Sequence, residues 1–161
     1  MPQWTLFEQD FRVIDETLGE LIERTNAVSV HLVDRSGQVI TSSGRVGDLD
    51  PTGFASLIAA EFTANAELAQ MLGDRGVDAV VSEGKTRSVY SCMLAERVIM
   101  ATVYDRRSTL GLVRFRANRA ALALDGVFRV LLEKVGLAEG APGEPEFAAV
   151  AEQQVDALFG D

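Results

Sequence analysis

Five arginines lie within the sixteen residues 105–120, DRRSTLGLVRFRANRA, of a chain whose formal net charge is −9. They are Arg106, Arg107, Arg114, Arg116 and Arg119. Such a group could neutralise the phosphates of a nucleic acid, or it could place one guanidinium in the phosphoryl-transfer site of a partner. The arginines could also belong to helices and strands that have only a structural role.

Helical projection separates these arginines. A helix from about Ser108 puts one apolar stripe on a single face, at roughly 100° per residue; its members are Leu110, Val113, Ala117, Ala120, Ala121, Leu124, Phe128, Leu131 and Val135. Arg114 then lies at the margin of that face, and Arg116 and Arg119 project from the far side. The alternation in GLVRFR also fits a short strand. Because the pI is about 4.6 and the arginines share no face, we expect no nucleic-acid partner.

Other residues with reactive side chains form no recognisable catalytic set. Gly84-Lys85-Thr86 resembles the end of a phosphate-binding loop, but Ala79 stands where that motif needs glycine, and a strand pattern follows. We therefore interpret it as a hairpin turn. His31 and Cys92, each the only residue of its type, are expected to be a strand histidine beside a buried core cysteine rather than a nucleophilic pair. We expect no metal, no cofactor and no enzymatic activity.

Composition is that of one globular domain. The chain has 161 residues, 47% hydrophobic and 24% charged, and its N-terminus lacks the pattern of a secretory signal. No apolar run approaches the ~18 residues of a membrane span. One cysteine is too few for a disulfide or a cysteine metal site, so we expect a cytoplasmic protein that does not insert into membranes.

Hydrophobic periodicity predicts the element order α-β-β-α-β-β-β-α. We expect helices over about 5–25, 51–72 and from about 108 to 135, with strands flanking a turn at 34–37 and again at 77–83, 88–94 and 97–104. Asp50, Pro51 and Gly73 have the types expected at the ends of the second helix. This order favours an antiparallel α/β sandwich over 1–135. Residues 136–146 read as a linker, and 147–161 as an amphipathic tail helix.

The second helix has polar residues within its apolar stripe. That stripe is expected to be Phe54, Leu57, Ile58, Leu68 and Leu72, with Phe62 on its flank. Glu61 and Asn65 fall inside it, which indicates either a local pair near solvent or a symmetric contact between two copies of the helix. The opposite flank is expected to be exposed and carries mostly small residues: Ala55, Ala59, Ala60, Thr63, Ala66 and Glu67.

Three segments resemble the Roadblock/LC7 family: VHLVDRSGQVITSSG, FASLIAAEFTANAELAQMLG and SVYSCMLAERVIMATVYDRRSTLGLVRFR. With the closing EFAAVAEQQVDALFGD, the chain is most similar to the family's bacterial MglB group, whose members partner a small Ras-like GTPase, MglA. The resemblance implies a five-stranded antiparallel sheet with the 51–72 helix on one face and the other two helices on the opposite face. It also implies a homodimer, with Glu61, Asn65, Val77, Val80 and Val81 at the contact.

The resemblance further implies a GTPase-activating protein that supports cell polarity and motility, concentrated at a cell pole. Such a protein holds the switch segments of the GTPase, which supplies its own catalytic arginine, so no residue here is catalytic. The GTPase-binding residues would be Ala59, Ala60, Thr63 and Glu67. The tail would contact a second site on the GTPase through Phe147, Val150, Val155, Leu158 and Phe159.

Two other functions fit the sequence. Relatives tend to carry Gly, Ala or Asn at the positions of Ala60, Glu61, Thr63 and Glu67, so this face is bulkier and more acidic here. The chain could instead be a scaffold that binds a GTPase or cytoskeletal partner without stimulating hydrolysis. Small-molecule sensor domains also wrap helices around an antiparallel sheet, but the strand pattern here contains no polar cluster.

Overall fold

The computed structural model describes residues 8–134, which form three helices and five strands. The elements are α1 (Glu8–Thr25), β1 (Ser29–Asp34), β2 (Val39–Gly44), α2 (Pro51–Met71), β3 (Ala79–Glu83), β4 (Arg87–Leu94), β5 (Val98–Asp105) and α3 (Leu110–Lys134). This is the order expected from the sequence. The linker and tail expected over 136–161 lie outside the described residues.

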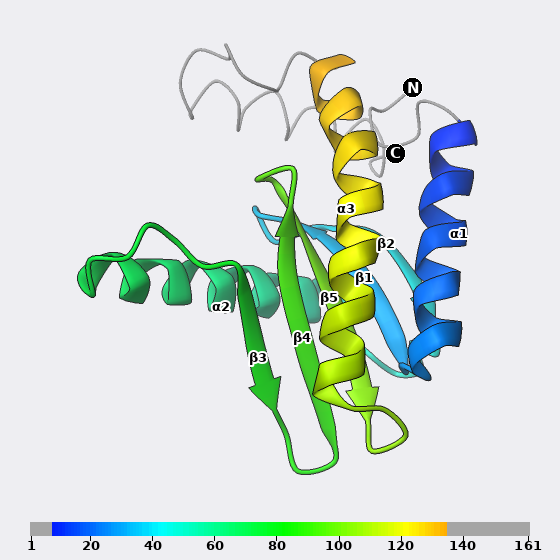
Figure 1. Ribbon diagram of the computed structural model, residues 1–161, viewed down its shortest axis with the longest axis horizontal. Helices are drawn as coiled ribbons and strands as arrows, with labels where there is room; N and C mark the ends of the chain where they lie inside the picture. The colour runs from blue at the N-terminus through cyan, green and yellow to red at the C-terminus, as the bar shows by residue number, and fades with distance from the viewer. Residues whose placement is uncertain (1–7, 135–161) are drawn as a thin grey trace.

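The strands form one antiparallel sheet in the order β2-β1-β5-β4-β3. Figure 1 shows α1 and α3 side by side on one face of this sheet, while α2 crosses the strands on the other. The five-stranded sheet with one helix on one face and two on the opposite face is confirmed.

Strand alternation divides the interior into two cores, because successive side chains of a strand point to opposite faces. In β5, Val98 and Met100 join the larger core beneath α1 and α3, whereas Ile99 and Ala101 face α2. The larger core takes its helical side chains from both helices: Ile14, Leu18, Leu21, Val113, Ala117, Ala120, Leu124, Phe128, Leu131 and Leu132. The structure also places GLVRFR in a helix, not a strand.

The residues at the ends of the helices and strands have the backbone geometry and capping contacts described next. Gly37 and Gly73 both have positive φ, at 95° and 82°, as the hairpin and the helix end require. The Thr109 Oγ1 accepts a hydrogen bond from the amide of Leu112 at 3.2 Å and so caps α3. Asp50 is the N-cap residue of α2 and Pro51 follows it, as expected, although the Asp50 carboxylate makes no capping hydrogen bond.

Candidate functional site

Helix α2 buries one narrow face against the sheet. Its buried residues are Ala55, Ile58, Ala59 and Phe62, which have the i, i+3, i+4, i+7 spacing of one helix face. The last three of these pack in one core with Val80, Ile99 and Ala101. Two of the four buried side chains are alanines, so the helix lies close to the strands and presents most of its circumference outward.

The apolar stripe expected for α2 is largely outside the core. Leu57 is 72% exposed and Leu68 56%, and Met71 and Leu72 at the helix end are 83% and 85% exposed. The expectation that Leu57, Leu68 and Leu72 are core residues is therefore wrong. Leu57 lies on the side of α2 opposite its buried residues, whereas Leu68, Met71 and Leu72 belong to the C-terminal part, which extends past β3 where no sheet lies beneath it (Figure 1). Exposed apolar side chains grouped in this way mark a contact surface.

The residues expected to bind a GTPase do not all lie on this exposed surface. Ala60, Thr63 and Glu67 are exposed, whereas Ala59 is only 6% exposed and packs on the sheet. Ala55 is fully buried as well, so both alanines were placed on the wrong side of α2. Contact of the three exposed residues with a partner stays a prediction.

Glu61 and Asn65 lie half-buried between the core face and the exposed face of α2. The Asn65 Nδ2 donates a hydrogen bond to the backbone carbonyl of Glu61 at 2.9 Å. This contact uses one donor of the Asn65 amide and does not involve the Glu61 carboxylate. A role for the two residues in a dimer contact stays a prediction.

Strand β3 is one edge of the sheet and pairs, within residues 8–134, only with β4. Its unpaired backbone groups can accept another strand. Val80 points beneath α2 and is almost fully buried, whereas Val77 and Val81 are half-buried. The overhanging end of α2 and the open edge of β3 are consecutive in the chain, and together they form what we call the α2–β3 surface.

His31 and Cys92 do not form a pair. The His31 ring lies 4.7 Å, centroid to centroid, from Phe54 of α2, whereas Cys92 belongs to the core on the opposite face of the sheet. Burial lowers the pKa of His31 to about 4 and raises the pKa of the Cys92 thiol to about 12. Both residues are therefore uncharged at neutral pH, and the expectation that they are neighbours is wrong.

The remaining candidates are structural too. Gly84 donates its backbone N–H to the carbonyl of Arg87 at 3.0 Å, which closes the β3–β4 hairpin as expected for GKT. Residues 8–134 contain no group of three His, Cys, Asp or Glu side chains that could hold a metal ion. No helix in this range is long and apolar enough to cross a membrane.

The arginines of 105–120 do not form one continuous patch, although Arg116 and Arg119 share their surroundings. The Arg107 guanidinium contacts Asp105, and that of Arg114 lies 5.8 Å from the centre of the Tyr90 ring. Arg116 and Arg119 both stack on Phe115 and line a groove against α1. Their projection away from the packed helices was therefore wrong, because α1 lies along that side of α3.

Comparison with known proteins identifies the fold. A family model described as Roadblock/LC7 domain matches residues 13–104. The structure is similar to that of Myxococcus xanthus MglB, with 34% sequence identity and a TM-score of 0.73, over 79% of this chain and 96% of that chain. No match is found among curated protein sequences.

Two further solved structures are similar over comparable lengths. One is described as MglB with tetrameric arrangement, at 26% identity and a TM-score of 0.74, over 82% of this chain and 99% of that chain. The other is the gliding protein MglB from Thermus thermophilus, at 25% identity and a TM-score of 0.72, over 79% of this chain and 96% of that chain. The similarity thus spans nearly the whole of each MglB chain.

Proposed function

This chain belongs to the Roadblock/LC7 family, and we propose that it is a homodimeric regulator of a small Ras-like GTPase of the MglA type. In this proposal it stimulates GTP hydrolysis by holding the switch segments of the GTPase, in support of cell polarity and motility. The observation that carries the proposal is the 34% identity to Myxococcus xanthus MglB over 79% of the chain. The protein acts in the cytoplasm and is concentrated at a cell pole.

The α2–β3 surface supports the dimer. Open strand edges in natural proteins are usually covered, and pairing β3 with a second copy would cover this one. The same pairing would bring the overhanging ends of two α2 helices together and bury Leu68, Met71 and Leu72. Glu61, Asn65, Val77 and Val81 would then lie at or near the contact.

The exposed side of α2 supports partner binding. Ala60, Thr63 and Glu67 lie on the part of the helix that the sheet does not cover, so a GTPase can reach them without rearrangement of the core. We further propose that residues 1–135 form the regulatory domain and that 136–146 link it to the tail helix 147–161. The tail would bind a second site on the same GTPase.

Phosphate release by the MglA-type GTPase of the same source tests the function. Wild-type protein should accelerate it, and Thr63→Arg should abolish the acceleration by placing a long charged side chain at the contact. The matched control is Leu122→Arg, which puts the same side chain at an exposed position of α3 on the opposite face of the sheet. Arg107→Ala should retain full stimulation, because the GTPase supplies the catalytic arginine.

Three results would separate the alternatives. Loss of stimulation in Arg107→Ala but not in Thr63→Arg would replace the proposed mechanism with an arginine supplied in trans. Complex formation with unchanged hydrolysis would identify a scaffold. Sedimentation equilibrium should give twice the 17.4 kDa chain mass, and a wild-type monomer would contradict the proposed dimer.

A further inference from the structure

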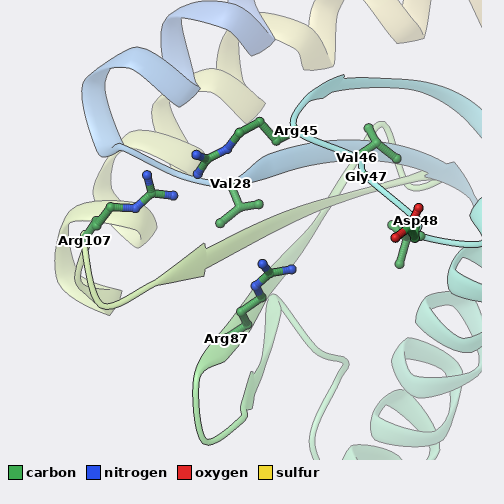
Figure 2. Close-up of a pocket in the computed structure, with 8 residues that line it drawn as sticks. Val28, Arg45, Val46, Gly47, Asp48, Arg87 and Arg107 are labelled. Atoms are coloured by element: carbon green, nitrogen blue, oxygen red, sulfur yellow. The ribbon is translucent and has the colours of Figure 1, made fainter.

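Three arginines from separate segments surround one hollow at the end of the sheet where β2 and β5 finish and β4 begins. The cavity measures about 580 Å³ and is lined by Arg45, Arg87, Arg107, Asp48, Val28 and Leu49, among others. Figure 2 shows Arg45 and Arg107 on one side of Val28 and Arg87 on another. We call this hollow the arginine pocket. The ends of β2, β4 and β5 that surround it lie away from the end of α2 that overhangs β3 (Figure 1).

The positive charge of this pocket is mostly unpaired. Within residues 8–134, the side chains of Arg45 and Arg87 make no ion pair with a carboxylate. Only Arg107 is paired: its Nε and Nη2 lie 3.1 and 3.2 Å from the two oxygens of Asp105. The net charge of the chain is −9, so this local concentration of positive charge is opposite in sign to the protein as a whole and indicates a binding site for an anion.

Hydrogen bonds hold the backbone at two of the three arginines. The Arg45 amide donates a hydrogen bond to the Val28 carbonyl at 2.8 Å, and Gly44 before it has a φ of 94°. A Cβ at Gly44 would lie 2.6 Å from that carbonyl oxygen, so glycine allows this close approach. On the other side, the Arg107 amide donates to Asp105 Oδ1 at 3.0 Å.

We propose that the arginine pocket binds the diphosphate group of a small soluble molecule. Guanidinium groups match phosphate oxygens with paired donors, and two separated positions around Val28 suit two linked phosphates. The volume falls in the range of about 300–1,000 Å³ typical of small-ligand pockets, and Val28, Val46 and Leu49 offer an apolar wall to the rest of the molecule. This proposal is independent of the GTPase partner.

The observations favour a soluble ligand over a nucleic acid or an anionic membrane. Both are extended polyanions, and the net charge of −9 repels them over the rest of the surface. A small diphosphate fits within the hollow, where the charges nearest to it are those of the three arginines. Asp48 on the rim further disfavours a ligand that spreads beyond the pocket.

Isothermal titration of the full chain with pyrophosphate at low salt tests the proposal. We expect one saturable site per chain and stronger binding of pyrophosphate than of inorganic phosphate. Arg45→Ala and Arg87→Ala should each weaken binding about tenfold or more, because each removes charge-assisted hydrogen bonds. The control is Arg12→Ala, which removes the same charge from an exposed position on α1 and should leave affinity unchanged.

Parallel titrations distinguish the ligand classes. A nucleoside diphosphate should bind at least as tightly as pyrophosphate, because its organic part can contact the apolar wall. Tighter binding of hexaglutamate peptide, or of phosphatidylcholine vesicles containing phosphatidic acid, would overturn the proposal in favour of a protein or membrane partner. Equal losses in Arg12→Ala and Arg87→Ala, or no binding of pyrophosphate, would also overturn it.

Discussion

The His31 Nδ1 lies 2.8 Å from the Ser42 Oγ on the neighbouring strand, and its Nε2 lies 2.9 Å from the Ser29 Oγ. Both ring nitrogens are thus used within the sheet, and Phe54 of α2 covers the ring. The two serines can exchange hydrogen bonds with a neutral imidazole, but no carboxylate is among these contacts to balance an imidazolium.

This arrangement predicts a loss of stability in acid. Burial lowers the pKa of His31 from 6.5 to about 4, so between these values the unfolded chain binds a proton that the folded chain excludes. The free energy of unfolding should therefore fall as the pH drops from about 6.5 towards 4, by up to about 3 kcal/mol from this residue. Urea unfolding at several pH values measures it.

Two His31 variants isolate that contribution from the surface carboxylates, which titrate in all the proteins alike. His31→Gln keeps polar groups near the serines, and His31→Phe packs against Phe54. Each should show a flatter pH dependence than wild type between pH 7 and 4. The same slope in all three proteins would show that His31 is not responsible.

Cys92 should be unreactive in the folded protein. Because burial raises its pKa to about 12, only about one thiol in ten thousand is ionised at pH 8. A thiol reagent should label it only after unfolding. The control is Thr63→Cys, which adds an exposed thiol on α2 and should label at once. Equal labelling rates at the two cysteines would refute the prediction.

The β4–β5 turn should gain stability from glycine. Ala95 and Glu96 both have positive φ, at 53° and 56°, and Arg97 N donates to Leu94 O at 3.2 Å. A side chain is strained in this conformation, so Glu96→Gly should raise the free energy of unfolding by about 0.5–1 kcal/mol. Glu96→Ala is the control, because it removes the same carboxylate and keeps the strain. Equal stability of the two variants would contradict this account.

Two leucines of α3 should differ sharply in their contribution to stability. Leu124 is fully buried beneath the helix pair, whereas Leu122, two residues earlier, is 78% exposed. Leu124→Ala should cost about 2–5 kcal/mol through lost burial and a cavity. Leu122→Ala should change stability by no more than about 0.5 kcal/mol. Similar losses at both positions, measured by denaturant unfolding, would place the core of α3 elsewhere.

Sequence periodicity predicted the buried residues correctly where a helix or strand has one buried face and one solvent-exposed face. In α3, every described residue of the expected stripe lies in or against the larger core, including Val113, Leu124 and Phe128. The turns at Gly37 and Gly73 were also predictable, because both residues have a positive φ, which glycine adopts more readily than other residues.

Periodicity failed at α2, the element of the candidate site. Leu57 and Leu68 have the same type and spacing as core residues, and only their exposure in the fold separates them from Ile58 and Phe62. A contact surface and a core face are both apolar, so the sequence alone does not distinguish them. The arginine pocket has no local sequence signal, because its three arginines lie far apart in the chain and line one hollow only where β2 and β5 end and β4 begins.

The sequence by itself determined the order of the elements and a sheet covered by helices, because both depend on local patterns of burial and turn formation. The family was indicated by the resemblance of whole segments to Roadblock/LC7 proteins. Tertiary structure alone decided which apolar residues of α2 are covered, since that depends on which side of the helix faces the sheet and on how far the helix extends past β3. It also decided that His31 and Cys92 lie on opposite faces of the sheet, and which arginines share a hollow. Those properties arise from long-range packing, which joins residues that no local pattern connects.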